Sequence, residues 1–258
     1  MLQSLSSSFL SQPWAMALFI VIDVAVLILI IALNYKICAK RLLDILFSLI
    51  AMAVFLPFFI IFLIIQKIYA KKTGEYESLF CKTYFLGKKQ KLRYKTRFTC
   101  ENKQGETTKL GKVLKAVKIA YYPQLVNVFT GNLSFIGPMP LSVADCNAIK
   151  EEDSARFSVR AGLISSLERY GGEGLTYPDM FEEDAEYVKS RNFFKDISFF
   201  CAYFLAKIRG DKRNKLGECS QKTYIQSLLE SEKITEEQAQ KLEEQANEQI
   251  NNGLSNTL

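Results

Sequence analysis

The chain has 258 residues and a net charge of +6, from 33 Lys and Arg against 27 Asp and Glu, and it contains no histidine. The lack of histidine excludes the commonest general base and the commonest metal ligand from any site built by these residues. The six cysteines form no C-x-x-C pair, which argues against a structural zinc site and a disulfide framework and predicts free thiols in a reducing compartment.

The first apolar segment runs from Trp14 to Leu33 and is long enough to span a bilayer. Residues 1–13 carry no charged side chain, whereas basic residues follow the segment from Lys36 onward. The positive-inside rule therefore places the N-terminus outside and Lys36 in the cytoplasm. We expect residues 1–37 to form an N-terminal transmembrane helix. A single carboxylate interrupts it, Asp23, which either faces a partner helix as a tolerated polar group or forms a specific pairing site.

A second apolar segment, Leu42 to Gln66, has basic residues on both flanks: Lys40, Arg41, Lys67, Lys71 and Lys72. Both ends therefore favour the cytoplasmic face. Pro57 near the middle removes a helix hydrogen bond and favours a bend. These features predict a re-entrant membrane helix over residues 38–72, broken at Pro57. The alternative is a second spanning helix, which would place the rest of the chain outside the cell.

The segment from Lys82 to Lys118 holds twelve Lys or Arg and only two acids. It is either a solvated basic face or a surface that contacts anionic headgroups or phosphates, and its position directly after the membrane segment favours the second interpretation. Nucleic acid is not expected as a partner, because no nucleic-acid-binding motif accompanies the charge.

Apolar residues at helical spacing predict a helix over Leu110–Ile119. Pro123 suits the first turn of a second helix, and Gly131 is a plausible stop. The sequence "NLSFIGPMP" then predicts a short strand followed by a rigid turn. A further helix over Phe193–Ile208 is equally compatible with a membrane interface and with an ordinary core.

The composition becomes acidic and polar from about Asn214. The motif "TEEQ" at Thr235 is a capping box that precedes an apolar periodic run. Residues 214–258 are therefore expected to form an acidic tail with one or two mobile helices.

Several fragments fall in the order found in one family: "KRLLD" before the proline-broken helix, "YKTR" at Tyr94, "LGKVLK" at Leu110, "PQLVNVFTGNLSFIGPMP" from Pro123, "RFSVRAG" at Arg156, "DAEYV" at Asp184 and "KDI" at Lys195. The segment from Pro123 is highly specific, and the other fragments are weak individually. Over roughly residues 38–210 the chain resembles the bacterial sugar transferase family, the monotopic polyprenol-phosphate phosphoglycosyl transferases.

The resemblance implies an α-rich α+β fold that associates with the bacterial inner membrane. In this fold residues 73–213 form a small cytoplasmic phosphoglycosyl-transferase-like domain with amphipathic interfacial helices. Family members transfer a sugar-1-phosphate from a nucleotide diphosphate sugar to a polyprenol phosphate, with magnesium. The implied partners are membrane lipid, polyprenol phosphate and a UDP-sugar.

The departures from the family pattern fall on the chemistry. The family has an Asp-Glu dyad, whose aspartate carries a covalent phosphosugar, at the positions of Ala120 and Tyr121. The arginine of its Gly-Pro-Arg-Pro motif is Met139, its Pro-Gly-x-Thr-Gly is Ala161 to Ser165, and its Ser-Pro break is Leu56-Pro57. Substrate-binding positions that the resemblance carries over are Lys95, Arg97, Gln124, Gly137, Pro138, Pro140, Arg156 and Arg160.

Three functions stay open. The favoured one is a catalytically degenerate scaffold or regulator of polysaccharide or glycoconjugate assembly, without a cofactor, that pairs with an active relative; a methyl group and an unactivated phenol cannot replace the dyad. The second is an active, magnesium-dependent transferase with a relocated carboxylate from Asp145, Glu168 or Glu173, which are otherwise solvated loop acids. The third is a binding protein without turnover, which requires Lys95, Arg97, Arg156 and Arg160 to converge on one site.

Overall fold

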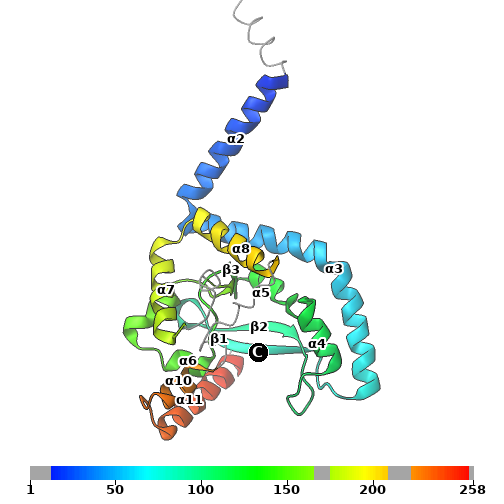
Figure 1. Cartoon of the computed structure of the whole chain (residues 1–258), viewed down its shortest axis with the longest axis vertical. Helices are drawn as coiled ribbons and strands as arrows, with labels where there is room; N and C mark the ends of the chain where they lie inside the picture. Colours follow the sequence, from blue (N-terminus) through cyan, green and yellow to red (C-terminus); the bar gives the residue numbers. More distant parts are fainter. Residues whose placement is uncertain (1–12, 166–174, 209–221, 256–258) are drawn as a thin grey trace, which may run out of the picture.

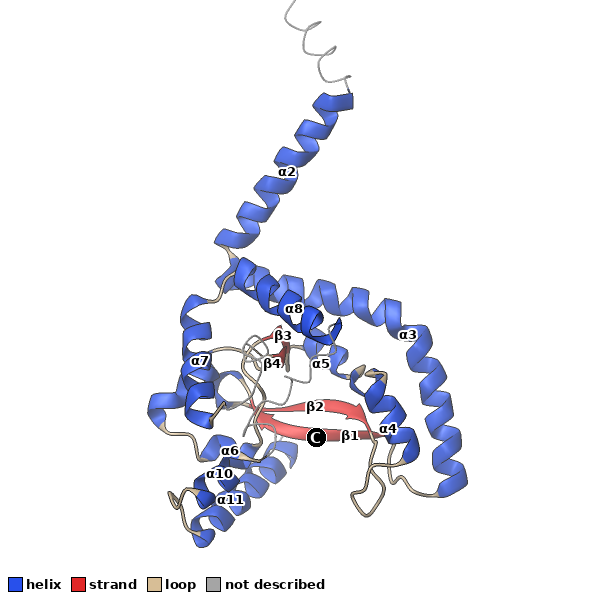
Figure 2. Cartoon of the chain, viewed as in Figure 1, coloured by secondary structure: helices blue, strands red, loops and turns tan. Residues whose placement is uncertain are grey.

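The computed structural model describes residues 13–165, 175–208 and 222–255. A long N-terminal helix projects from a domain of helices and short strands, and most of the described chain is helical (Figures 1 and 2). The elements, in order, are α2 (Pro13–Leu33), a π-helical turn (Tyr35–Ala39), α3 (Lys40–Thr73), β1 (Phe80–Leu86), β2 (Leu92–Phe98), α4 (Lys109–Ala116), a 3₁₀ turn (Ile119–Tyr121), α5 (Gln124–Thr130), β3 (Ser134–Ile136), α6 (Val143–Asn147), a 3₁₀ segment (Glu151–Ser158), β4 (Gly162–Ile164), α7 (Tyr177–Ser190), α8 (Phe193–Ile208), α10 (Tyr224–Glu230) and α11 (Glu236–Ser255).

Both α2 and α3 are long and apolar enough to cross a membrane. The second of them is a continuous helix of 34 residues with Pro57 inside it. Figure 1 shows that α3 bends near its middle. A proline within a helix bends it without ending it when the neighbouring turns remain paired. The break expected at Pro57 is therefore a bend within one helix, and the re-entrant course of α3 stays a prediction.

The first turns of α3 attach it to the rest of the domain. Lys40 forms an ion pair with Asp196 of α8. Arg41 donates hydrogen bonds of 2.6 Å to two backbone carbonyls at the end of α5. The buried carboxylate of Asp44 accepts from the Ser134 hydroxyl at 2.8 Å and from the next backbone N–H at 3.1 Å. The fragment "KRLLD" thus supplies the ion pair and the hydrogen bonds that attach the apolar helix to the domain.

Two small sheets complete the domain. Strands β1 and β2 pair antiparallel, and β3 and β4 pair parallel. Two glycines allow the parallel pair to approach closely: a Cβ on Gly137 would lie 2.4 Å from the Arg160 carbonyl oxygen, and one on Gly162 would lie 2.2 Å from the Gly137 nitrogen. The steric requirement explains glycine at both positions. The β1–β2 hairpin is not among the elements expected from the sequence.

Four elements between Lys109 and Ile208 agree with the sequence-based expectations, whereas α6, β4 and α7 were not among those expected. The helix α4, the helix α5 and the strand β3 occupy the predicted segments, and α8 has the predicted bounds. Gly131 ends α5 in a left-handed conformation with φ +90°, which a residue with a side chain rarely adopts. All the described cysteines are free thiols, and Cys219 lies outside the described residues.

The tail helices pack against the domain, contrary to the expectation of mobile helices. The backbone N–H of Ile225 in α10 donates to Asp145 of α6 at 3.1 Å. Tyr224 is buried against the rings of Tyr177 and Phe181. The capping box at Thr235 is confirmed by its reciprocal bonds to Gln238.

Candidate functional site

A cleft of about 600 Å³ opens where β2, α5, the β3–β4 pair, α8 and the part of α3 around Phe55 meet. Most of its lining is apolar or aromatic, which is typical of sites that take small molecules or lipid chains. The described residues that line it are Phe55, Lys95, Val117, Lys118, Ile119, Tyr121, Tyr122, Gln124, Leu125, Leu133, Phe135, Met139, Pro140, Gly162, Leu163, Ile164, Ser165, Phe200, Tyr203 and Phe204.

The first dyad position points away from this cleft. Ala120 has 0% of its surface exposed and belongs to an apolar cluster with Phe98, Cys100 and Leu114. Side chains of α3 pack on the same cluster, among them Phe59 and Phe62. The local geometry follows from the turn at Lys118, whose φ of +61° starts the 3₁₀ segment. Position 120 therefore holds a methyl group in the core.

The second dyad position does line the cleft. Tyr121 is 38% exposed, and the ammonium group of Lys118 lies 5.7 Å from its ring centroid. Its phenol offers neither a nucleophile at neutral pH nor a metal-binding carboxylate. The two positions at which the sequence analysis expects the family dyad thus hold a buried methyl group and a partly exposed aromatic ring.

Tyr122 connects the cleft to the membrane helix, a role that the sequence analysis did not assign. Its hydroxyl donates to the carbonyl of Met52, five residues before Pro57, at 2.7 Å, and its ring stacks on Phe59 with centroids 4.5 Å apart. Burial raises the pKa of Tyr122, so the phenol stays neutral near pH 7. This tyrosine therefore holds the segment beside the cleft against α3.

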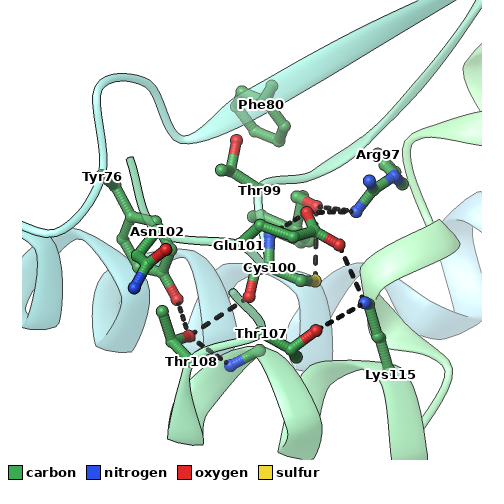
Figure 3. Close-up of polar contacts among 12 residues, drawn as sticks. Tyr76, Phe80, Arg97, Thr99, Cys100, Glu101, Asn102, Thr107, Thr108 and Lys115 are labelled. Atoms are coloured by element: carbon green, nitrogen blue, oxygen red, sulfur yellow. Dashed lines mark hydrogen bonds and ion pairs between the residues drawn. The ribbon is translucent and has the colours of Figure 1, made fainter. Parts of the chain in front are cut away.

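Of the four basic residues expected at a binding site, only Lys95 lines the cleft. Burial, together with the nearby Arg97, lowers the pKa of Lys95. Figure 3 shows Arg97 held by Glu101, whose other carboxylate oxygen contacts Lys115. The two distances are 3.0 and 2.8 Å. Although burial opposes it, hydrogen bonds from Lys115 and Arg97 lower the pKa of Glu101 to about 2. Arg97 is thus committed to an internal ion pair.

Arg156 is buried and pairs with Asp184 at 3.5 Å, while a second nitrogen donates to the Met139 carbonyl. Burial raises the pKa of Asp184 to about 6, against the opposing charge of Arg156. Arg160 donates to the Gly131 carbonyl at 3.1 Å and lies beside the β1–β2 turn. The structure therefore does not bring the four basic side chains to one site.

The remaining predicted positions divide between the cleft and the packing beneath it. Gln124 and Pro140 line the cleft, as does Met139 in place of the family's arginine. Pro138 lines a void of only about 10 Å³ next to Arg156. Three aromatic residues of α8 complete the cleft and were not selected from the sequence: Phe200, Tyr203 and Phe204. Their spacing on one helical face is the signal that could have revealed them.

The described cleft does not fit a magnesium ion. None of its described lining residues is Asp or Glu, and the described part of the chain holds no group of three or more His, Cys, Asp or Glu able to bind a metal. Magnesium in proteins is usually held by one or two carboxylates and substrate phosphates. Asp145 is buried in α6 and binds the tail helix, and Glu168 and Glu173 lie outside the described residues.

Comparison with known proteins gives a consistent result. The sequence pattern of the bacterial sugar transferase family matches residues 34–210. A Bacillus subtilis (strain 168) protein described as the uncharacterized sugar transferase EpsL is 32% identical over 94 residues, 36% of this chain and 46% of that protein. The Caulobacter vibrioides UDP-glucose:undecaprenyl-phosphate glucose-1-phosphate transferase is 30% identical over 98 residues, 35% of this chain and 37% of that protein. The matches thus span less than half the length of these curated relatives.

Proposed function

The chain belongs to the bacterial sugar transferase family, whose pattern covers more than half of it, and from that premise we propose that it is a membrane-bound, catalytically inactive member that acts as a scaffold or regulator in polysaccharide or glycoconjugate biosynthesis. The observation that carries this proposal is the buried methyl group of Ala120 beside a cleft whose described lining has no carboxylate. Losing a covalent nucleophile costs many orders of magnitude in rate.

The membrane attachment is supported by exposed apolar surface beyond α2 and α3. Large apolar side chains are exposed on α8, α5 and α4: Phe194, Ile197, Phe200, Phe204, Leu205, Val126, Phe129, Val113 and Val117. Contiguous exposed apolar surface marks a membrane or protein contact. We place these helices at the cytoplasmic leaflet of the bacterial inner membrane, with α3 re-entrant and the domain on the cytoplasmic face.

The cleft retains features that suit a lipid phosphate. Its walls are apolar and aromatic, Phe55 of the membrane helix lies in them, and Lys95 supplies a cation. These groups can hold an isoprenoid chain and one phosphate without turnover. A polyprenol phosphate, a UDP-sugar and an active sugar transferase of the same membrane are the partners we propose.

The test is covalent trapping. The full-length protein, purified in detergent, is incubated with UDP-glucose, UDP-galactose and UDP-N-acetylglucosamine in the presence of magnesium, and its intact mass is measured. We expect no mass increase for a phosphosugar. A transferase-competent relative with an intact Asp-Glu dyad is the positive control, and a stoichiometric adduct on this chain would contradict the proposal.

One observation favours a second candidate, an active enzyme with a relocated carboxylate. Ser165 lines the cleft, and Glu168 and Glu173 follow it closely in the sequence. In this case Glu168→Gln or Glu173→Gln would abolish an activity that Asp145→Asn leaves intact, because Asp145 is engaged with the tail helix.

A further inference from the structure

A second concavity, of about 150 Å³, lies beside the turn of the β1–β2 hairpin and shares none of the described residues that line the cleft. Five cations line it: Lys88, Lys89, Lys91, Arg93 and Arg160. Its other lining residues are Gly131 and Asn132, so no carboxylate is among them. We call this concavity the hairpin pocket.

The described hydrogen-bond partners of the cations in the hairpin pocket carry no charge. Arg160 donates through Nε to the Gly131 carbonyl, and Arg93 donates to the Asn132 side-chain oxygen at 3.3 Å. These partners are neutral groups. No ion pair joins any of the five cations to a carboxylate among the described residues. The pocket therefore concentrates positive charge without an internal counterion.

Lys88 is close enough to two other cations of the pocket, Lys89 and Arg160, to be repelled by them. Burial, then the charges of Arg160, Arg191 and Lys89, lower the pKa of Lys88. A dianion in the pocket would reverse that repulsion and stabilise the protonated lysine. A concavity lined by charges of one sign attracts ions of the opposite sign.

The turn that carries the lysines has an uncommon backbone. Lys89 and Gln90 both have positive φ, +60° and +53°. Two successive residues of this kind make the hairpin turn that Asn-Gly fits best, whereas residues with long side chains adopt it at a cost. Here the turn holds Lys89 over the pocket between two further lysines of the same loop. Costly local geometry is often retained where it positions functional groups.

The place of the hairpin pocket in the fold limits its ligand. Gly131, which lines it, ends α5, and the Arg41 guanidinium at the start of α3 lies 3.1 Å from where a Gly131 Cβ would be. Arg41 directly precedes the apolar segment, so the pocket lies at the level where α3 would enter a bilayer. Its volume of about 150 Å³ leaves room for a phosphate or diphosphate group.

We propose that the hairpin pocket binds a phosphate or diphosphate group, carried either by an anionic lipid headgroup or by a soluble ligand, at a site separate from the cleft. Lysine and arginine recognise phosphate oxygens by charge-assisted hydrogen bonds. Binding in the hairpin pocket requires no turnover and is therefore independent of any activity in the cleft.

The experiment measures the labelling of individual lysines by an amine-reactive reagent, read by mass spectrometry, with the full-length protein in nanodiscs. One arm adds inorganic pyrophosphate to nanodiscs of phosphatidylcholine, with sodium chloride at equal ionic strength as the reference. The other arm compares phosphatidylcholine nanodiscs with nanodiscs that also contain phosphatidylglycerol. Lys103 and Lys109, which are exposed and outside the pocket, are the internal controls.

We expect at least a fivefold fall in the labelling of Lys88, Lys89 and Lys91, with less than a twofold change at the controls. Protection by pyrophosphate in the neutral nanodiscs identifies a soluble phosphate ligand, and protection by phosphatidylglycerol alone identifies a headgroup. If neither arm protects the three lysines beyond the controls, the proposal is wrong.

A pair of matched double variants supplies a second readout. Lys88→Gln with Lys91→Gln should weaken pyrophosphate affinity at least tenfold, whereas Lys103→Gln with Lys109→Gln should change it less than twofold. Equal losses in both pairs would show a diffuse surface effect and overturn the pocket. The labelling of the unaltered chain decides the question if the first pair does not fold.

Discussion

At the residue scale, the chemistry of the site depends on two positions with different surroundings. Ala120 lies in the core between β2, α4 and α3, whereas its neighbour Tyr121 faces the cleft. The two side chains therefore differ in both packing and chemistry. An aspartate at position 120 would have to displace Phe59 and Phe62 or enter an apolar cluster as a buried carboxylate.

This difference gives a prediction for restoring the dyad. Ala120→Asp should lower the free energy of unfolding by about 3 kcal/mol, because a buried carboxylate without a partner is costly. Tyr121→Glu at the half-exposed position should change it by less than about 1 kcal/mol. Thermal unfolding of the two variants in the same detergent measures both effects, and equal melting temperatures would contradict the placement of Ala120.

The buried pair of Arg156 and Asp184 gives a second prediction. Arg156→Met should lower stability by about 3 kcal/mol at pH 8, because it leaves the Asp184 carboxylate uncompensated in the core. Lys95→Met, on the cleft wall, is the matched control and should cost less than about 1 kcal/mol.

The pH dependence of the Arg156→Met defect has a definite sign. The folded-state pKa of Asp184, about 6, lies above its ordinary value of 3.8, so the protonated acid favours folding below pH 3.8 and this contribution is lost as pH rises through 6. Removing Arg156 raises that pKa further. The defect should therefore be smaller at pH 5 than at pH 8. A defect that does not vary between these pH values would show that Asp184 is not the group that Arg156 stabilises.

The basic residues show what a sequence can and cannot indicate at this scale. Lys95, Arg97, Arg156 and Arg160 were expected from the resemblance, and each is present in a structured part of the domain. Their directions depend on partners far along the chain, such as Asp184 for Arg156. Long-range ion pairs of this kind leave no local pattern in the sequence, so convergence on one site could not be judged from it.

At the element scale, hydrophobic periodicity and the positions of proline and glycine were enough to predict the two apolar helices, α4, α5, β3 and α8. The β1–β2 hairpin did not. Its turn residues Lys89 and Gln90 replace the Asn-Gly pair that signals a two-residue turn. The segment Leu92–Phe98 does alternate, with its three basic residues at every second position on one face, but the basic charge of the longer stretch was interpreted as a surface and not as a strand. The packing of α10 on α6 was missed because the bond from Ile225 to Asp145 is also non-local.

The course of α3 is an element-scale prediction. Both ends of α3 carry basic residues, and Tyr122 ties the turn before Pro57 to the domain. An epitope tag inserted between Gln104 and Gly105, in an exposed turn, should be reached by antibody only after the inner membrane is permeabilised. A tag at the N-terminus, on the opposite side, is the control for membrane integrity. Labelling of the inserted tag in intact spheroplasts would show that α3 spans the membrane.

The same arrangement predicts the effect of straightening the helix. Pro57→Ala should restore the missing backbone hydrogen bond and reduce the bend. The straighter helix would then strain the hydrogen bond between Tyr122 and Met52. Combined with Tyr122→Phe, Pro57→Ala should move a detectable fraction of the inserted tag to the outer side. Proteolytic access to the tag in spheroplasts measures that fraction, and Tyr122→Phe alone should leave the tag inside.

At the scale of the whole molecule, this member of the bacterial sugar transferase family has a cleft whose described lining contains no carboxylate. Polar contacts from Lys40, Arg41 and Asp44 hold α3 against the domain, and the domain also contains the cleft. The cluster around Ala120 is apolar, and its burial favours the folded state. We therefore propose that the protein is stable, membrane-bound and without transferase turnover.

Nucleotide release tests that claim most directly. The full-length protein is incubated with a panel of UDP-sugars, undecaprenyl phosphate and magnesium, and the released UMP is quantified against a reaction without polyprenol phosphate. We predict release no greater than that background for every sugar, with or without magnesium. Release that requires polyprenol phosphate and magnesium, and that persists in Glu168→Gln, Glu173→Gln and Asp145→Asn taken separately, would contradict the inactive assignment. Loss of that release in one of the three variants alone would also contradict it and would identify the carboxylate responsible.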